Sequence, residues 1–317
     1  MNIWLSFLID SLAFGATFIY GSTGEILTEK AGHLNLGIPG IMCMGGAGGC
    51  LVLNMVGKSG LPPFLIVILG ILGALAFSML CGLIYSFLAV SLRANQNVTG
   101  LALTTFGVGL MKVIFSKLNA VTYLVSTKDY YHWPFAAEKN SLQLLGVLFF
   151  LAIIIAILAS WILFRTRVGL QLRAVGENPG TADAVGINVT RYKYLATCIG
   201  SGIAGLGGFY YIIDYMVSQE AYLSVEALGW LSIALVIFAL WRPHMTIIGS
   251  TVFGILFSLG GFITNVSWIK VTMATTPLLK MLPYVVTIIV LVISSIRNKR
   301  ENQPPASLGL SYFREER

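Results

Sequence analysis

Residues 63–91 read PFLIVILGILGALAFSMLCGLIYSFLAVS, a run that carries no charged side chain. A helix needs about 20 apolar residues to cross the ~30 Å hydrocarbon core of a bilayer. Inside that core only helices and closed barrels satisfy every backbone polar group, and the run lacks the alternation of a barrel strand. It therefore predicts a transmembrane helix. Because the run is longer than a single span needs, it is compatible with a tilted helix, a broken helix or a re-entrant turn.

Similar runs recur along the 317 residues, of which 56% are apolar and 10% charged. A soluble domain carries about 25% charged residues. The sequence therefore predicts an all-α membrane protein, a polytopic helical bundle of about nine transmembrane helices with a range of eight to ten. The predicted spans are 3–23, 34–55, 63–91, 98–118, 142–164, 194–217, 227–241, 244–263 and 283–296.

The domain organisation follows from the same pattern. One transmembrane domain is expected over residues 1–300, since no soluble domain interrupts the series of spans. It contains a polar loop at 165–193 and is followed by a polar tail at 301–317, to which we assign no structure.

Basic residues indicate the orientation of the chain. Placing the loop 165–193 in the cytoplasm puts 13 of the 20 lysines and arginines on that side, as the positive-inside rule requires. The N-terminus is then outside and the C-terminus cytoplasmic. The net charge of +7 is thus read as a topology signal, and no nucleic acid polymer is expected as a partner. The cytoplasmic basic residues are Lys30, Arg93, Arg165, Arg167, Arg173, Arg191, Lys193, Arg242, Arg297, Lys299, Arg300, Arg314 and Arg317.

The N-terminus also lacks the basic region and the cleavage site of a signal peptide, so the first span is expected to remain in the mature protein.

Cysteine and histidine do not form a metal or catalytic pattern. The cysteines lie in apolar spans without paired spacing, which is typical of small buried residues. The histidines lack the spacing of metal ligands, and no nucleophile is accompanied by a base. We therefore predict no catalytic residue, no metal site and no cofactor bound by this chain. The residues concerned are Cys43, Cys50, Cys81, Cys198, His33, His132 and His244.

Two short motifs resemble nucleotide sites. Gly200, Gly202 and Gly205 spell G-x-G-x-x-G, which indicates a dinucleotide site only between a strand and a helix. Here the motif lies in an apolar span, where small residues allow close helix packing, as they do for Gly45 and Gly49. The tripeptide at 57–59, Gly-Lys-Ser, lacks the first glycine of a P-loop. The chain is thus not expected to bind ATP.

Acidic residues within spans are costly and are usually functional. Asp10 lies in the first span and Asp214 near the outer end of the sixth. Glu25 and Glu29 lie at the inner end of the first span, beside Lys30, where a position at the membrane interface is the alternative. We take Glu25 and Asp214 as candidates for a translocation path.

The polar loop contains signals for a short helix. Asn178 and Pro179 fit an N-cap and the first helical position, and Gly186 fits the C′ position, which predicts a helix over 179–185. Such a helix is not stable alone in water. A small apolar face of Ala182 and Val185 suits docking on a soluble partner, and a solvated connecting loop is the alternative.

Two segments together resemble a known family. They are GEILTEKAGHLNLGIPGIMCMGGAGG at 24–49 and RTRVGLQLRAVGENPGTADAVGINV at 165–189. They are similar to the two signatures of ABC importer permeases for branched-chain amino acids, ribose, other simple sugars and nucleosides. The form of the first is most similar to the shorter permease of nucleoside importers. That permease commonly has an acid where this chain has Pro39, so any role of the carboxylate is absent here.

The resemblance implies a permease domain in the bacterial cell membrane and a set of partners. An ATP-binding subunit would hold ATP and Mg²⁺ and hydrolyse ATP, so this chain would not be an enzyme. A second, different permease and an extracellular substrate-binding lipoprotein would complete the importer. Nucleosides are the expected solute and simple sugars the alternative. The coupling helix, which lies in a cleft of the ATP-binding subunit, would involve Arg173, Gly176, Glu177, Asn178, Ala182, Asp183 and Gly186.

The implied mechanism is alternating access, in which the spans rock about a central path. Asn35 and Gly37, near the start of the second span, are further candidates for this path, since an amide can hydrogen-bond a neutral solute without burying a charge. A secondary transporter driven by an ion gradient is the main alternative, and the glycine and proline interruption at 37–49 favours it. A membrane-embedded enzyme would need inward-facing histidines or acids, which the sequence does not group.

Overall fold

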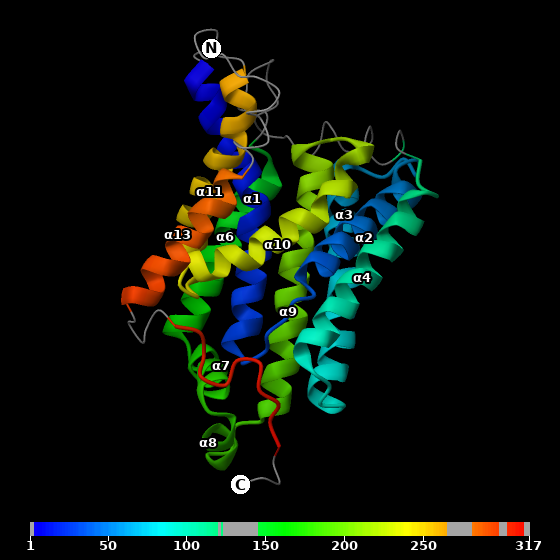
Figure 1. The fold of residues 1–317 in the computed structure, drawn as a ribbon. Helices are drawn as coiled ribbons and strands as arrows, with labels where there is room; N and C mark the ends of the chain where they lie inside the picture. The colour runs from blue at the N-terminus through cyan, green and yellow to red at the C-terminus, as the bar shows by residue number, and fades with distance from the viewer. Residues whose placement is uncertain (1–2, 120–121, 123–144, 265–280, 298–302, 314–317) are drawn as a thin grey trace.

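The computed structural model describes residues 3–119, 122, 145–264, 281–297 and 303–313, and this part of the chain is a bundle of helices without a strand (Figure 1). Eight of the helices, α1 to α4, α6 and α9 to α11, are long and apolar enough to cross a bilayer. The all-α membrane fold and the predicted range of spans are thus confirmed. The helices are α1 (Ile3–Lys30), α2 (Ile38–Val56), α3 (Pro63–Ser86), α4 (Gln96–Phe115), α6 (Val147–Arg165), α7 (Arg167–Glu177), α8 (Pro179–Ala184), α9 (Val189–Tyr210), α10 (Tyr222–Phe238), α11 (Pro243–Thr264) and α13 (Leu282–Arg297).

The first helix is longer than its apolar run. It continues past the predicted end at 23 to Lys30, and this last part contains Glu25 and Glu29. Both glutamates are buried inside the protein and do not face lipid. An apolar run in the sequence marks the part of a helix that can face lipid. A polar side chain that is surrounded by other helices can extend the span, because it avoids the cost of exposure to lipid.

Neither the glycine-rich second run nor the long third run contains a break. Helix α2 is continuous from Ile38 to Val56, with Pro39 in its first turn, where a missing N–H costs nothing. Helix α3 ends in a π-helical turn, η1 (Phe87–Ser91), and α9 ends in another, η3 (Tyr211–Tyr215). A short 3₁₀ turn, η4 (Gln219–Ala221), then leads into α10. The third run therefore spans once.

Helices α1, α2 and α9 form the centre of the bundle and cross at glycines. A Cβ atom on Gly45 would lie 2.2 Å from the carbonyl oxygen of Gly205, and one on Gly200 would lie 2.4 Å from that of Gly24. Backbones this close are the reason small residues are needed at helix crossings in membranes. The G-x-G-x-x-G motif thus serves helix packing, as predicted.

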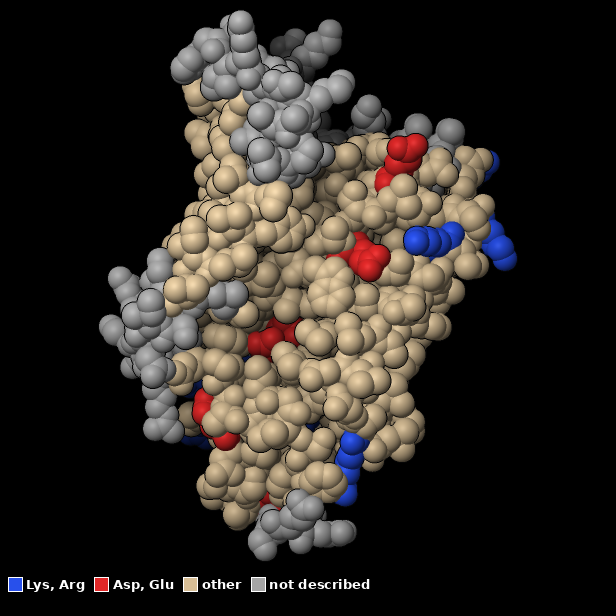
Figure 2. All heavy atoms as spheres, viewed as in Figure 1, with Lys and Arg blue, Asp and Glu red and all other residues tan. Residues whose placement is uncertain are grey.

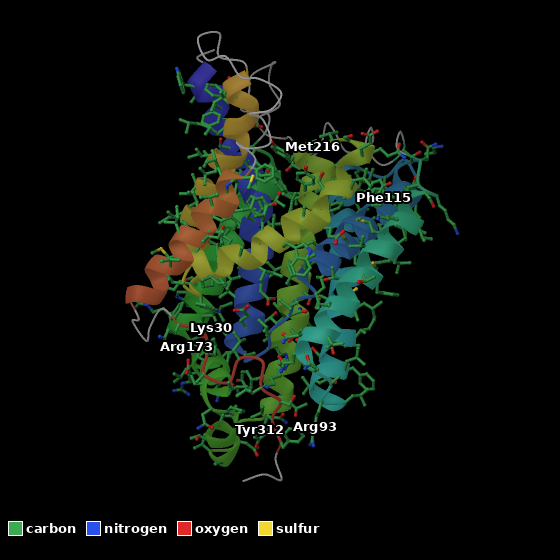
Figure 3. The ribbon with its side chains drawn as sticks, viewed as in Figure 1. Lys30, Arg93, Phe115, Arg173, Met216 and Tyr312 are labelled. Atoms are coloured by element: carbon green, nitrogen blue, oxygen red, sulfur yellow. The ribbon has the colours of Figure 1, made fainter. Side chains whose placement is uncertain are left out.

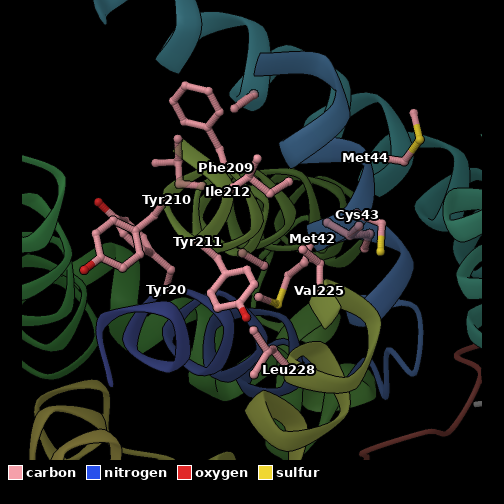
Figure 4. Packing of buried hydrophobic residues seen from close by; sticks show 14 of the residues in the cluster. Tyr20, Met42, Cys43, Met44, Phe209, Tyr210, Tyr211, Ile212, Val225 and Leu228 are labelled. Atoms are coloured by element: carbon pink, nitrogen blue, oxygen red, sulfur yellow. The ribbon is translucent and has the colours of Figure 1, made fainter. Parts of the chain in front are cut away.

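The interior around these crossings is apolar and aromatic. Figure 4 shows Tyr20 of α1, Met42 of α2, Phe209 of α9 and Leu228 of α10 converging on one cluster of buried side chains. The outer helices instead expose large apolar side chains, and most of the lateral surface in Figure 2 carries no charge. This is the pattern of a bundle surrounded by lipid.

The cysteines are free, and three of the four, Cys43, Cys50 and Cys81, are buried as predicted, whereas Cys198 is half-buried.

Residues 303–313, which we call the C-terminal strap, pack at the end of the bundle where α7 and α8 lie (Figure 1). Ser307 N donates to Gly176 O at 3.1 Å, and Gly309 N donates to Gly32 O at 3.2 Å. No local sequence motif marks this packing, because the acceptors that hold the segment are carbonyl groups of α7 and of the residues after α1.

Candidate functional site

The short helix α8 begins at a side-chain cap. Asn178 precedes it in an extended conformation, and its Oδ1 accepts a hydrogen bond from Thr181 N at 3.0 Å. Pro179 occupies the first helical position, where its fixed φ suits the helix. Both assignments agree with the sequence prediction.

The end of α8 is a Schellman motif. Gly186 has a φ of +86°, and its N–H donates to Asp183 O at 3.0 Å. The next N–H, of Ile187, donates to Ala182 O at 3.0 Å. This pair of bonds needs a left-handed residue at the C′ position, which glycine adopts without strain. The predicted helix and its C′ glycine are therefore confirmed.

The predicted apolar face of α8 is wrong in one respect: Ala182 and Val185 do not lie on the same side. Ala182 is 2% exposed and packs with Val175 of α7 and Val189 of α9, whereas Val185 is 71% exposed. Val185 caps the helix with a φ of −90° and a ψ of +12°, so the helical spacing that would align it with Ala182 has already ended. The exposed apolar side chain at the end of α8 is therefore that of Val185.

Helix α7 contacts α1 through its backbone. Gly176 is buried, and a Cβ atom there would lie 2.2 Å from Lys30 O at the end of α1. The carbonyl of Gly176 also accepts from both the N–H and the hydroxyl of Ser307 in the strap. Displacement of α7 would thus push directly on the end of a central helix.

The charged residues of the loop lie around this contact. Arg173 is half-buried beside Lys30 (Figure 3). Glu177 is exposed, and its Oε2 accepts from Ala306 N of the strap at 3.4 Å. Asp183 Oδ2 accepts from the hydroxyl of Tyr312 in the strap at 2.9 Å. Two predicted coupling residues therefore also hold the strap.

A second group of predicted residues meets between the end of α1 and the start of α2. Glu25, Asn35 and Gly37 are all buried. Asn35 N donates to Glu25 Oε1 at 3.2 Å, and Asn35 Oδ1 accepts from Gly37 N at 2.9 Å. Within the described residues the side-chain nitrogen of Asn35, Nδ2, is buried and has no acceptor.

Gly37 contributes space to this group. A Cβ atom there would lie 2.7 Å from Asn35 Oδ1 and 3.1 Å from Leu103. Any larger residue would displace the Asn35 side chain.

The structure does not bring Asp214 into this group. Asp214 is buried in η3, beyond the end of α9, whereas Glu25 lies near the opposite end of the bundle, in the last turns of α1. Asp10 is at the same end as Asp214, and its Oδ1 accepts from Tyr215 OH at 3.0 Å. The acidic residues therefore form two separate sets.

Sequence reasoning missed the residues that hold the α1–α2 link, which we define as residues 31–37. Leu34 N donates to Gln96 Oε1 at 2.9 Å, and Leu34 O accepts from Tyr85 OH at 2.8 Å. Leu36 O accepts from Thr104 Oγ1 at 2.8 Å. Buried non-helical backbone is tolerated only where protein groups satisfy it. No local motif marks these partners, because each is on a distant helix.

Two other buried polar side chains near the link have partners. Glu29 Oε2 accepts from Trp241 Nε1. His33 Nδ1 shares a hydrogen bond with Thr197 Oγ1 at 2.9 Å. Burial, and after it the charge of Lys193, lower the pKa of His33 well below its usual value, so the ring is neutral.

The described residues contain no group of three potential metal ligands. His244 Nδ1 shares a hydrogen bond with Ser160 Oγ at 2.8 Å, and His132 lies outside the described residues.

Comparison with known proteins gives one family and several relatives. Residues 7–291 match the family described as branched-chain amino acid transport system, permease component. The nucleoside ABC transporter permease protein NupC of Lactococcus lactis is 32% identical over 89% of this chain and 90% of its own. The guanosine ABC transporter permease protein NupQ of Bacillus subtilis is 29% identical over 90% and 91%. A proposed glucose ABC transporter permease, TsgC13 of Haloferax volcanii, is 30% identical over 78% and 75%.

A solved ABC transporter of a proposed metal-chelate type, in an inward-facing conformation, is similar over 92% of this chain and 85% of its own. Its TM-score is 0.44 and its identity 15%.

Proposed function

Because the chain belongs to the family of branched-chain amino acid transport system permease components, we propose that it carries nucleosides through the membrane as one subunit of an ATP-driven importer. Membership makes it a multi-pass transport subunit. The observation that best supports coupling to a partner is the arrangement of α8, a short capped helix with an exposed apolar side chain, beside α7, which contacts α1 directly.

The proposed coupling runs through three elements. Helix α8 docks in a cleft of an ATP-binding subunit, with Val185 as its apolar contact. Asn178 and Gly186 hold the two ends of α8, while Ala182 fixes its inner side to α7 and α9. Motion of α8 then reaches α1 through the contact between Gly176 and Lys30. Since this contact is between backbones, it transmits displacement with little side-chain compliance.

In this proposal each subunit of the importer performs a different step of transport. The ATP-binding subunit binds ATP and Mg²⁺ and performs the hydrolysis, and this chain performs none. A different permease chain completes the path, and a substrate-binding lipoprotein delivers the solute from outside. The proposed orientation places the N-terminus outside and both the coupling loop and the C-terminus in the cytoplasm, in agreement with the distribution of basic residues.

Nucleosides are favoured because two relatives that this chain matches over about nine-tenths of its length are named for nucleosides or guanosine. Sugars are the second candidate, because TsgC13 is named for glucose. In either case the free amide Nδ2 of Asn35 offers a neutral donor to a polar solute. Glu25 and Gly37 support this donor by holding the backbone and side chain of Asn35, and Asp214 is assigned to the outer part of the path.

The alternative function, an ion-coupled secondary transporter, is no longer favoured by the second span. That alternative depended on an interrupted second span, and α2 is continuous through all its glycines.

The docking proposal is tested by Val185→Asp. A charge on the exposed side chain of α8 should leave the fold intact and weaken co-purification of the ATP-binding subunit at least tenfold, with a parallel loss of uptake. Val98→Asp is the matched control, because Val98 is 65% exposed and lies in the first turn of α4, where an acid is tolerated. Equal co-purification of the two variants would contradict the docking role.

The solute is tested on the complete importer in proteoliposomes. We expect ATP-dependent uptake of labelled adenosine or guanosine that unlabelled nucleosides inhibit and glucose does not. Asn35→Ser keeps an oxygen that can accept from Gly37 N and removes the amide donor, so it should raise KM for the nucleoside. Uptake inhibited by glucose alone would replace the nucleoside proposal with the sugar one.

A further inference from the structure

A cavity of about 730 Å³ lies between the end of η1, the turn from α8 to α9, the start of α9 and the C-terminal strap. It is distinct from the Glu25 and Asn35 group, and no step of the proposed transport uses it. Three basic residues line it, Arg93, Arg191 and Lys193, together with the hydroxyl-bearing Tyr194 and Tyr312. Figure 3 shows Arg93 and Tyr312 side by side at this end of the molecule.

Lys193 is the unusual member of this set. The residue is 3% exposed and lines the cavity, and within the described residues its Nζ has neither a hydrogen bond nor an ion pair. An ammonium that has lost most of its water and has no partner is costly, and the cost is removed by an anion at hydrogen-bond distance. The acid that lines the cavity, Asp183, already accepts from Tyr312 OH.

From this arrangement we infer that the cavity is a binding site for a phosphate group. Two arginines at the rim and a lysine in the wall match the charge of phosphate, and arginine can bind it through two parallel hydrogen bonds. The N-terminus of α9, which begins at Val189 on the cavity wall, adds its positive dipole end to the same space.

The size of the cavity decides which phosphates fit. Its volume lies within the ~300–1,000 Å³ typical of small-molecule pockets, so a mononucleotide or another small phosphate ester can enter whole. The headgroup of an anionic phospholipid presents the same chemistry. Both sources would place negative charge among η1, the α8–α9 turn and the strap.

Such a ligand would act on coupling. The residues that line the cavity include Asp183 and Gly186 of the coupling loop and Ser311 of the strap. A bound anion would link these elements to η1 and so restrict motion of α8. The inference goes beyond the proposed transport, because a site for a charged phosphate is not a site for a neutral nucleoside.

Binding is measured first on the purified full-length chain in detergent, by calorimetric titration with inorganic phosphate, AMP and adenosine. We expect phosphate and AMP to bind and adenosine not to bind. Lys193→Met should weaken AMP binding at least tenfold without lowering the unfolding temperature of the free chain, since it removes an uncompensated charge. Lys112→Met is the matched control, because Lys112 is exposed in α4 away from the cavity.

The source of the phosphate is decided in nanodiscs of phosphatidylcholine with or without phosphatidylglycerol. AMP binding that is equal in both supports a small phosphate ester. AMP binding that phosphatidylglycerol abolishes, with the lipid retained by the native chain and lost from Lys193→Met, supports a headgroup.

The inference is overturned if neither phosphate nor AMP binds, or if Lys193→Met binds AMP as tightly as the native chain does. It is also overturned if AMP binds the chain alone and not its complex with the ATP-binding subunit. The cavity would then belong to the subunit interface, where an acidic side chain of the partner takes the place of phosphate.

Discussion

Helix α8 and the α1–α2 link are both short segments in which an asparagine side chain accepts a hydrogen bond from a nearby backbone N–H. Asn178 accepts from Thr181 N, and Asn35 accepts from Gly37 N. In their other hydrogen bonds the two segments differ. The backbone bonds of α8 are made with residues of the same turn, as at Gly186 and Ile187. The link is held instead by side chains from α3, α4 and α1, among them Tyr85, Gln96, Thr104 and Glu25.

This difference reflects what surrounds each connection. The end of α8 is exposed, so water can satisfy groups that the motif leaves free. Most of the link is buried, and each of its polar groups needs a partner from the protein. The exposed connection can therefore move as a unit with a partner, whereas the buried one is tied to several helices. We therefore expect substitutions in α8 to affect mainly coupling, and substitutions around the buried link to affect mainly stability.

The largest effect is expected at α7, which lies between α8 and the end of α1 that precedes the link. Gly176→Ala places a Cβ atom about 2.2 Å from Lys30 O, so α7 must move away from α1. Overpacking against backbone should cost about 3 kcal/mol and abolish uptake. Gly180→Ala is the control, because the nearest atom to its Cβ would be Asn178 Oδ1 at 3.4 Å. Equal unfolding temperatures of the two variants in detergent would refute the close contact.

The next effect concerns the buried link. Gln96→Leu leaves Leu34 N and Leu310 O without their side-chain partner, which should cost about 2 kcal/mol of stability. Asn97→Leu, at the exposed neighbouring position, should cost almost nothing. The unfolding temperatures of the two variants and the native chain are compared. If Gln96→Leu unfolds at the native temperature, the link does not depend on this side chain.

A smaller effect on stability, with a larger effect on coupling, is expected for Gly186→Ala. A left-handed conformation costs a residue with a Cβ atom about 1 kcal/mol. Gly60 provides a matched control, since it has a φ of +68° and, like Gly186, open space around it. Both variants should lose similar stability. Only Gly186→Ala should reduce solute-stimulated ATP hydrolysis by the complex, and a similar loss in Gly60→Ala would remove the specific role of Gly186.

The smallest effect is a pH dependence of the link. His33 faces Thr197 and Lys193 of α9 and Tyr85 of α3, and its pKa is lowered by burial and by the Lys193 charge. The folded state therefore resists protonation. The contribution of neutral His33 to the free energy of unfolding is complete above the unfolded-state pKa of about 6.5. This contribution is lost as pH falls below that value, by no more than about 1 kcal/mol at pH 6.

His33→Gln should remove this slope while keeping the bond to Thr197. Unfolding temperatures of the native chain and the variant are compared between pH 8 and pH 5.5. Parallel curves would show that His33 does not titrate in this range.

The features predictable from the sequence are those that short stretches specify. Apolar runs located each of the eight membrane-length helices, although α1 ends beyond its predicted end and α10 begins before its predicted start, and Asn178, Pro179 and Gly186 located α8. The orientation of Ala182 was not predictable, because it depends on α7 and α9 packing against α8. The strap was not predictable either, since it forms no helix and its partners include backbone carbonyls of distant residues.

By itself, the sequence determined that the chain is a helical membrane protein, where its spans lie, and that its main polar loop carries a capped helix. These properties depend on lipid thickness and on local backbone geometry, which act on neighbouring residues. Only the tertiary structure decided that Glu25 and Asn35 meet, that Gly176 abuts Lys30 and that Lys193 is buried on a cavity wall. Such contacts join helices far apart in the chain, and only the packing of those helices brings the groups together.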